Sequence, residues 1–303
     1  MKILSEFLGT MKSFSLYEIQ GLLRAYGGKL EEVNDNYLIF ETDSAERIAK
    51  RVTFSRRLGI VVEDGLIDIG NRSFALREGK CHEAESKIPS IAAKIRGRVD
   101  LEHPDVTFVI YDCGKLIMTR NIFERKESSL LDSGYRVRPF NHPSSISPVI
   151  ARAMINVASL RDNDLFVDPF AGTGTFLIEG YRMNVRGIGI DRDRRMVEGC
   201  NRNLAFFGFP ETAVLGDFSH LLEAGNLSAI VTDPPYGRGA RIFSDSRESL
   251  YARLFSLFAD INMPKVFVLP SVELLDLAKQ YMKVEIVENV RVHSSLTRLI
   301  VKA

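Results

Sequence analysis

The stretch that decides the fold is Phe166-Val167-Asp168-Pro169-Phe170-Ala171-Gly172-Thr173-Gly174-Thr175. Its first residues have the apolar character of a short buried strand, and a glycine-rich turn then leads into a helix that extends to Met183. Gly172 and Gly174 can adopt a positive φ and let the backbone approach a ligand closely. Free N–H groups at the helix N-terminus suit a small carboxylate as well as a phosphate. The stretch therefore predicts a cofactor-binding turn.

The spacing within this turn disfavours two common nucleotide sites. Leu177 stands where the third glycine of G-x-G-x-x-G would be, which disfavours a dinucleotide cofactor. No lysine follows Gly174, which disfavours a P-loop for ATP.

Short apolar runs alternate with helix-like segments in the second half of the chain. The strand-like runs, most of which end in an acidic residue, are Leu165–Asp168, Gly187–Asp191, Ala213–Asp217, Ala229–Asp233 and Val266–Leu269. This alternation predicts a Rossmann-like α/β domain whose mostly parallel, doubly wound sheet is covered by helices on both faces. Two final runs, Val284–Val292 and Thr297–Val301, predict an antiparallel edge pair and bring the sheet to seven strands.

Aspartates at the strand ends extend the predicted cofactor site. Asp191 ends the strand that follows Asp168, where an acidic residue binds ribose hydroxyls in nucleoside-binding folds. Asp217 ends the third strand and can accept a hydrogen bond from an adenine amino group. Each aspartate alone also fits a solvated turn, but the ordered series favours a nucleoside site. Its predicted residues are Asp168, Phe170, Gly172, Thr173, Gly174, Asp191 and Asp217.

A second motif, Asp233-Pro234-Pro235-Tyr236, follows the fourth strand at the same edge of the sheet. It suits a ring-attached amino group, which is a poor nucleophile because its lone pair is delocalised into the ring. The carboxylate of Asp233 and the carbonyl of Pro234 can accept its N–H hydrogens and stabilise the positive charge that develops on nitrogen. Tyr236 can stack on the base, an interaction worth about 1–3 kcal/mol. An accidental Pro-Pro turn is the alternative, and the neighbouring cofactor turn disfavours it.

The front part of the chain mixes short strand-like and helix-like runs, and predicts an α+β region. We divide the chain into a first segment at residues 1–46, a second at 47–125, a polar linker at 126–145 and the sheet domain at 146–303.

Basic residues gather near two of these features. Arg96 and Arg98 lie in the second segment, and Arg238 and Arg241 follow the D-P-P-Y motif in a glycine-rich run. Both pairs can contact phosphates, and the second can close over a nucleotide flipped out of its stack. A solvated surface is the more common meaning of such charges.

Composition adds few constraints. The chain has 303 residues, 45% of them hydrophobic, and a net charge of +1, which by itself gives no support to a nucleic-acid partner. No run of about 18 apolar residues occurs, so no membrane span is expected. Cys81, Cys113 and Cys200 lie far apart without a C-x-x-C pair. They predict free thiols in a reducing cytosol, with neither a disulfide nor a zinc site.

The cofactor turn and the D-P-P-Y segment resemble those of Rossmann-fold, S-adenosylmethionine-dependent amino-methyltransferases. Residues 138–143 (RPFNHP) and 293–298 (HSSLTR) narrow the resemblance to the archaeal and eukaryotic tRNA guanosine-10 N2-methyltransferases. Residues 72–77 (RSFALR) and 95–101 (IRGRVDL) resemble parts of the THUMP domain, an RNA-binding module.

This resemblance implies a fold and an activity. We expect a ferredoxin-like domain at 1–46, a THUMP domain at 47–125 and a class I methyltransferase domain at 146–303. S-adenosylmethionine is the implied cofactor, tRNA the implied partner, and the cytoplasm the implied location. Asp233, Pro234 and Tyr236 are the implied catalytic residues. Eukaryotic relatives use a small zinc-containing activator subunit, which makes such a subunit a candidate partner here.

Three other activities stay open. A sister THUMP family methylates tRNA position 6 and tends to carry N-P-P-Y, so Asp233 favours position 10. A DNA adenine-N6 methyltransferase also uses D-P-P-Y, but the front half contains no evident DNA major-groove module. A non-catalytic RNA-binding protein is the third alternative, and the intact Gly172, Gly174 and Asp191 argue against it.

Overall fold

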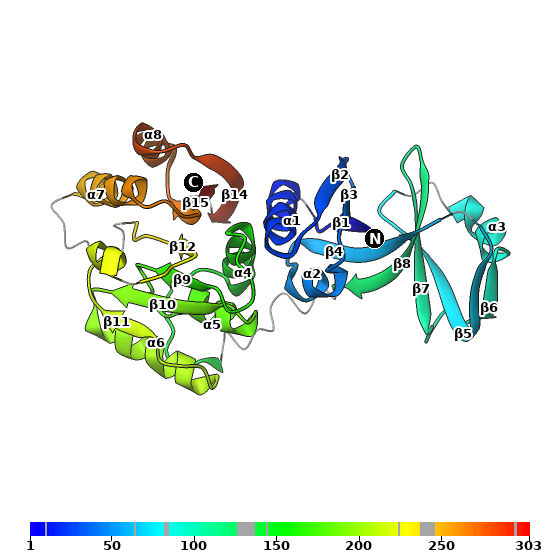
Figure 1. Ribbon diagram of the computed structural model, residues 1–303, viewed down its shortest axis with the longest axis horizontal. Coiled ribbons are helices and arrows are strands. Elements are labelled where there is room, and N and C mark those ends of the chain that lie inside the picture. Colours follow the sequence, from blue (N-terminus) through cyan, green and yellow to red (C-terminus); the bar gives the residue numbers. More distant parts are fainter. Residues whose placement is uncertain are drawn as a thin grey trace. The chain divides into compact units, whose positions relative to one another are not determined.

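The computed structural model describes residues 1–9, 11–63, 65–81, 85–125, 137–143, 145–223, 225–236, 246–293 and 296–303. The chain divides into two compact units, each built around one sheet (Figure 1). The first unit comprises Met1–Leu16 and Tyr26–Glu127, and the second comprises Tyr17–Ala25 and Ser128–Ala303. Within the described ranges, no helix has the length and hydropathy needed to cross a membrane.

The sheet of the first unit is mixed, with the strand order β2-β3-β1-β4-β8-β7-β5-β6. Its strands are β1 (Lys2–Phe7), β2 (Lys29–Val33), β3 (Tyr37–Glu41), β4 (Ser55–Val62), β5 (Ile67–Glu78), β6 (Ile95–Val99), β7 (Val106–Asp112) and β8 (Leu116–Glu124). The helices are α1 (Lys12–Tyr26), α2 (Ala45–Arg51), the 3-10 turn η1 (Glu85–Lys87) and α3 (Ile88–Ala92).

One sheet therefore runs through both front segments. Strand β1 pairs antiparallel with β3 and with β4, so residues on either side of position 46 belong to the same hydrogen-bonded layer. The division of the front part at residue 46 stays a prediction.

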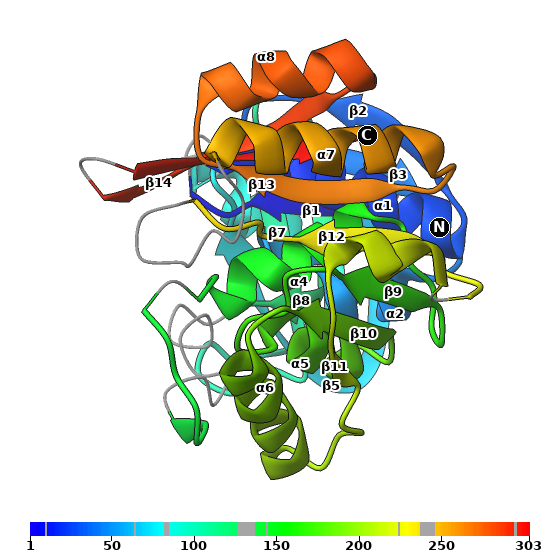
Figure 2. The same cartoon turned by 90° about the vertical axis from the view of Figure 1, so that its left-hand side faces the viewer.

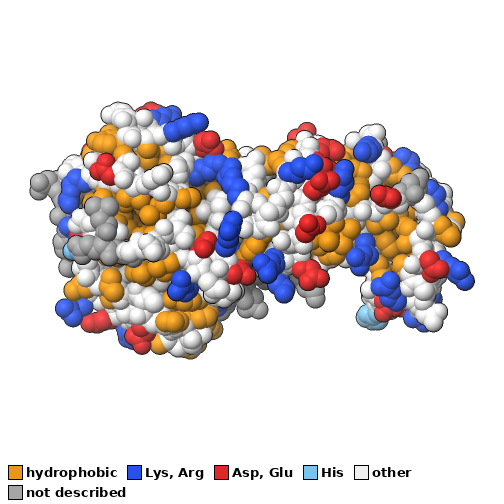
Figure 3. Space-filling view, viewed as in Figure 1, with side chains coloured by type: hydrophobic (Ala, Val, Ile, Leu, Met, Phe, Trp, Pro, Cys, Tyr) orange, Lys and Arg blue, Asp and Glu red, His pale blue; other side chains and the backbone are white. Residues whose placement is uncertain are grey.

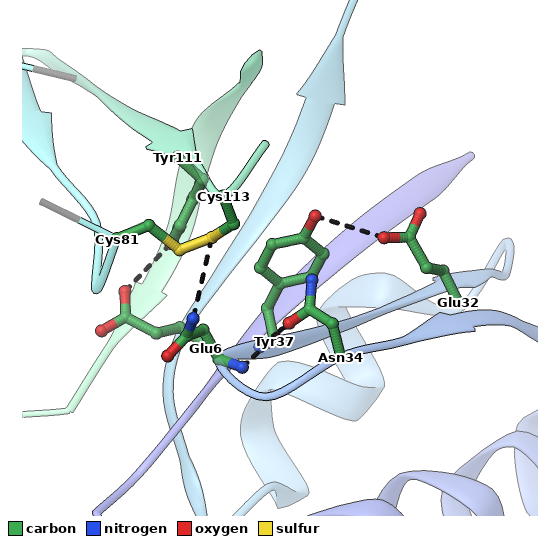
Figure 4. Close-up of a disulfide and its surroundings, with 8 residues drawn as sticks. Glu6, Glu32, Asn34, Tyr37, Cys81, Tyr111 and Cys113 are labelled. Carbon is green, nitrogen blue, oxygen red and sulfur yellow. Dashed lines mark hydrogen bonds between the residues drawn. A yellow bond between two sulfur atoms is a disulfide. The ribbon is translucent and has the colours of Figure 1, made fainter. Parts of the chain in front are cut away.

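Two of the three cysteines form a disulfide, which corrects the prediction of free thiols. Cys81 and Cys113 are bonded, with their Cα atoms 5.5 Å apart (Figure 4), whereas Cys200 is free and buried. Strands β5 and β7 are parallel neighbours in which Glu78 pairs with Ile110, and each cysteine lies three residues beyond its member of that pair. Parallel register, which spacing along the chain does not reveal, thus brings the two sulfur atoms together. Closing a loop of 32 residues stabilises a fold by about 3–4 kcal/mol in the chain-entropy account.

The second unit contains a seven-stranded sheet in the order β11-β10-β9-β12-β13-β15-β14. Its strands are β9 (Leu165–Asp168), β10 (Arg186–Asp191), β11 (Ala213–Leu215), β12 (Ala229–Thr232), β13 (Lys265–Leu269), β14 (Glu285–His293) and β15 (Leu296–Lys302). Figure 2 shows β13, β12, β9, β10 and β11 following one another in this order. These five strands are parallel, and β15 and β14 are antiparallel. The predicted edge pair is confirmed, but the sheet is mixed, which corrects the expectation of a mostly parallel sheet.

Helices cover both faces of this sheet, as predicted. They are α4 (Pro148–Val157), α5 (Thr175–Arg182), α6 (Arg194–Phe206), the 3-10 turn η4 (Phe218–Glu223), α7 (Arg247–Asp260) and α8 (Val272–Tyr281). Ile190 of β10 packs in a cluster with apolar side chains of α7 and α8. The adjacent Gly189 lies under Leu177 of α5, which a Cβ at Gly189 would approach to 2.8 Å. Because successive strand residues point to opposite faces, α5 and the α7–α8 pair lie on different faces.

The middle turns of α1 belong to the second unit, where they pack against α4. The amide of Asn156 donates a hydrogen bond to Glu18 at 2.8 Å, and both side chains are fully buried. Gly21 lies so close to α4 that a Cβ there would be 2.1 Å from the carbonyl oxygen of Asn156. A segment from the front of the sequence is thus part of the second unit's packing.

Candidate active site

The strand order reverses between β9 and β12, and the predicted site lies at the carboxyl ends of these strands. A pocket of about 440 Å³ opens there. Eight of the predicted site residues line it: Asp168, Phe170, Gly172, Thr173, Asp191, Asp233, Pro234 and Tyr236. The cofactor turn and the D-P-P-Y segment therefore share one cavity.

The glycine-rich turn has the backbone geometry that only glycine adopts easily. Gly172 has φ +52°, and its N–H donates to Oδ2 of Asp191 at 2.9 Å. Gly174 precedes α5 with φ +81°, and a Cβ there would lie 2.5 Å from the sulfur of Cys200. Gly174 is thus placed behind the pocket, where it allows the turn to pack on α6.

Asp168 and Asp191 accept hydrogen bonds that connect the strands and the turn around the pocket. Asp168 is buried, and its Oδ1 accepts from the hydroxyl of Thr232 at 2.6 Å, which ties β9 to β12. Burial raises the pKa of Asp168 to about 7. Burial also raises the pKa of Asp191. Its Oδ2 accepts a hydrogen bond from the backbone N–H of Gly172, and its Oδ1 accepts one from the backbone N–H of Asp193. A carboxylate has about four lone-pair positions, so Asp191 retains capacity for ribose hydroxyls.

Asp217, like Gly174, is a predicted cofactor residue that does not line the pocket. Its carboxylate is 2.5 Å from Nε of Arg192 and 3.9 Å from Arg253. The adjacent Phe218 lines the pocket instead, together with Arg192 and Met196. The sequence reasoning missed these three residues because they do not stand at the last position of a strand.

Asp233 is held from two sides. The hydroxyl of Tyr236 donates to Oδ1, and Nη2 of Arg298 lies 3.5 Å from Oδ2. Burial raises the pKa of Asp233 to about 6, against the lowering effects of the Arg298 charge and the Tyr236 hydrogen bond. Tyr251 of α7 donates to the carbonyl of Pro235 at 3.4 Å, which supports the double-proline turn. Sequence reasoning did not place Arg298 at the site, although it noted the run that contains it.

The structure describes two of the four arginines that were predicted to contact RNA. Arg96 and Arg98 are exposed on β6, an edge strand of the first unit's sheet, and Arg96 lies 3.6 Å from Asp68. Arg238 and Arg241 lie outside the described residues. On the face drawn in Figure 3, Lys and Arg side chains of the first unit are interspersed with Asp and Glu. Among the described residues, His, Cys, Asp and Glu form no group of three that can hold a metal ion.

Comparison with known proteins identifies the family. The model of an RMKL-like methyltransferase domain matches residues 135–300. A tRNA (guanine(10)-N2)-dimethyltransferase of Methanothermobacter thermautotrophicus is 32% identical over 84% of this chain and 82% of its own length. Another of that name from Pyrococcus abyssi is 30% identical over 97% of this chain and 96% of its own. The chain belongs to the tRNA (guanine(10)-N2)-dimethyltransferase family.

A relative named for another tRNA position is less similar to this chain than the two relatives above. A tRNA (guanine(6)-N2)-methyltransferase of Methanocaldococcus jannaschii is 26% identical over 71% of this chain and 77% of its own length. The matched methyltransferase domain contains the seven-stranded mixed sheet of the second unit. The D-P-P-Y segment, Asp233–Tyr236, lies inside the matched methyltransferase domain.

Proposed function

We propose that this chain transfers a methyl group from S-adenosylmethionine to the exocyclic N2 nitrogen of guanosine 10 in tRNA. The observation that carries the proposal is that Asp233 and Pro234 line the same pocket as Gly172 and Asp191. The proposed amino-group acceptor and the proposed nucleoside-binding residues thus line one cavity. The names of the two relatives that match most of the chain support guanine as the base and position 10 as the target.

The pocket residues fit S-adenosylmethionine. The tight turn at Gly172 brings backbone close to the cavity, Asp191 can accept from ribose hydroxyls, and Phe170 with Phe218 offers apolar surface for an adenine. The two phenyl rings lie 5.7 Å apart between centroids. When bound, the cofactor supplies an electrophilic methyl group on a sulfonium.

The D-P-P-Y residues act on the guanine. Asp233 and the carbonyl of Pro234 accept the N–H hydrogens of the amino group, which localises the nitrogen lone pair and directs it at the methyl carbon. This nitrogen would take up the methyl group that the bound cofactor gives up from its sulfonium, and would then release a proton to water. Positive charge grows on nitrogen before that release, and the ionised Asp233 stabilises it.

The front half of the chain is the proposed RNA-binding part. We assign residues 47–125 to a THUMP domain and residues 1–46 to a ferredoxin-like domain, with the linker and the methyltransferase domain behind them. The exposed Arg96 and Arg98 on β6 can contact tRNA phosphates, and Arg238 and Arg241 are proposed to act nearer the flipped guanosine. A tRNA substrate also supports a cytoplasmic location.

A small zinc-containing activator subunit is the further partner that we propose. Strand β11 is the edge strand next to β10, and it exposes about half of Val214 and of Leu215. Phe206 at the end of α6 is similarly exposed. An unpaired edge strand with apolar side chains beside it can receive a strand of another protein.

Labelled methyl transfer tests the proposed function. The purified chain is incubated with methyl-labelled cofactor and either tRNA or adenine-containing duplex DNA, and the products are digested to nucleosides. We expect N2-methylated guanosine from tRNA alone. Labelled N6-methyladenine from DNA would favour the DNA methyltransferase, and transfer to neither substrate would favour a non-catalytic RNA-binding protein.

A further inference from the structure

The carboxylate of Asp233 and the ring of Tyr236 share one cationic neighbour. Nη2 of Arg298 lies 3.5 Å from Oδ2 of Asp233, and its guanidinium carbon lies 5.5 Å from the centre of the Tyr236 ring. The Tyr236 hydroxyl closes the set by donating to Oδ1 of Asp233. Arg298 is only 6% exposed, so water screens this contact weakly.

Topology explains how a residue near the C-terminus reaches this place. Strand β15 is antiparallel to β13, and Leu299 pairs with Leu269, the last residue of β13. Arg298 precedes Leu299, so it lies at the edge where the parallel strands end. Asp233 directly follows β12, the parallel neighbour of β13 on its other side, and therefore stands at the same edge.

We propose that Arg298 is a positioning residue that holds the Asp233 carboxylate and the Tyr236 ring as one rigid receptor for the target amino group. The proposal rests on the proposed function. It assigns Arg298 no contact with the transferred methyl group. Its guanidinium lies over one face of the Tyr236 ring, and the proposal has the base stack on the opposite face.

Arg298 also keeps the receptor in its charged form. A buried carboxyl favours protonation, and the opposite charge of Arg298 opposes that tendency. A protonated Asp233 would lose the negative charge that stabilises the methylated nitrogen. Without Arg298, the carboxylate would be both less fixed and less ionised near neutral pH.

Among the described residues, the other titratable groups that interact with Asp233 are Tyr236, Tyr251 and Asp168. Tyr236 and Tyr251 have pKa values raised by burial, so both hydroxyls stay neutral through the working range. Asp168 on β9 interacts with Asp233 as a like charge, and its pKa is raised to about 7, mainly by burial. The titrations of both Asp168 and Asp233 can thus shape the acidic limb of the pH profile of kcat. In the proposal, only the contribution of Asp233 depends on Arg298.

The test compares kcat, KM for tRNA and cofactor affinity between pH 5 and 9 for the full chain and its Arg298 variants. We expect Arg298→Met to lower kcat at pH 7 about 10- to 100-fold and to move the acidic limb up by about one pH unit. Part of the loss should be recovered at pH 9, while KM and cofactor affinity change less than about threefold. Arg298→Lys keeps the charge without the planar guanidinium. Its acidic limb should therefore stay at the wild-type pH, and it should retain more activity than Arg298→Met.

Lys265→Met is the matched control. Lys265 is a buried cation on the neighbouring strand β13, and its ammonium donates to the carbonyls of Ile261 and Met263. Its loss should lower stability without moving the acidic limb. If Arg298→Met does not fold, Arg298→Gln is measured in its place, with the same limb shift expected.

Several results would overturn the inference. An equal loss of kcat at every pH, with the limb unmoved, would mean that Arg298 has only a structural role. A limb shift of the same size when Arg298→Met is made in an Asp233→Asn background would assign the shift to a group other than Asp233. Failure of the wild-type chain to methylate any guanosine would instead contradict the proposed function, a result that is distinct from both.

Discussion

At the scale of single residues, Asp233 is the side chain on which the proposed chemistry depends most. Asp233→Ala should lower kcat roughly 10²- to 10³-fold, by analogy with the loss of one oxyanion-hole group, because the lost interaction strengthens in the transition state. KM for tRNA and cofactor affinity should change little. Asp233→Asn keeps an acceptor oxygen and should retain more activity than Asp233→Ala. Steady-state kinetics with calorimetry of cofactor binding measure both effects, and loss of cofactor binding in Asp233→Ala would make the motif structural.

The prediction for the cofactor turn concerns a substitution at Gly174. Gly174→Ala places a Cβ 2.5 Å from the sulfur of Cys200 at a φ of +81°, so it should lower stability and weaken cofactor binding. Gly208→Ala is the matched control, because Gly208 has φ +75° with no heavy atom within 4 Å of its Cβ position. Both variants should lose about 1–2 kcal/mol of stability from the left-handed backbone. Only Gly174→Ala should lose more than this and weaken cofactor binding in calorimetry, and equal behaviour of the two would contradict the account.

At the scale of elements, the packing of α1 on α4 determines whether Gly21→Ala raises or lowers stability. Gly→Ala inside a helix ordinarily stabilises it by about 0.8–1 kcal/mol. Gly21→Ala should instead destabilise the second unit by about 1–3 kcal/mol, because its Cβ would meet the backbone of Asn156 at 2.1 Å. Ser13→Ala at an exposed position of α1 should be close to neutral. Thermal unfolding of the two variants measures the difference, and a stabilised Gly21→Ala would rule this packing out.

Elements whose signal is local were predictable from the sequence. The cofactor turn, the alternating strands and the final β14–β15 pair each have a pattern within a few residues. The disulfide between Cys81 and Cys113 depends on the parallel register of β5 and β7, and the place of Arg298 depends on β15 lying between β13 and β14. Such features arise from strand pairing across many residues, which apolar periodicity does not encode.

Asp217 illustrates a different limit. Its position at a strand end predicted a cofactor contact, but the charges of Arg192 and Arg253 engage its carboxylate away from the pocket wall. The identity of an ion pair depends on which helices pack beside the strand. The position of a residue on its strand was therefore predictable, but the partner of its side chain was not.

At the scale of the whole molecule, the proposed function assigns RNA binding to the front half of the chain and methyl transfer to the domain behind it. Reversing the charges with Arg96→Glu and Arg98→Glu should raise KM for tRNA about tenfold or more and lower kcat much less, because the proposed role of these side chains is to contact phosphates and not the guanine. The increase in KM should shrink at high salt. Kinetics at two salt concentrations measure it, and an effect confined to kcat would remove the docking role.

The proposed methyl acceptor is a guanosine at tRNA position 10. The most direct measurement is mass spectrometry of nuclease fragments from two tRNA transcripts incubated with the chain and S-adenosylmethionine, one with guanosine and one with adenosine at position 10. We expect N2-methylation at position 10 of the first transcript and none in the second. Methylation at position 6 of both transcripts, or methylated adenosine in the second, would contradict it.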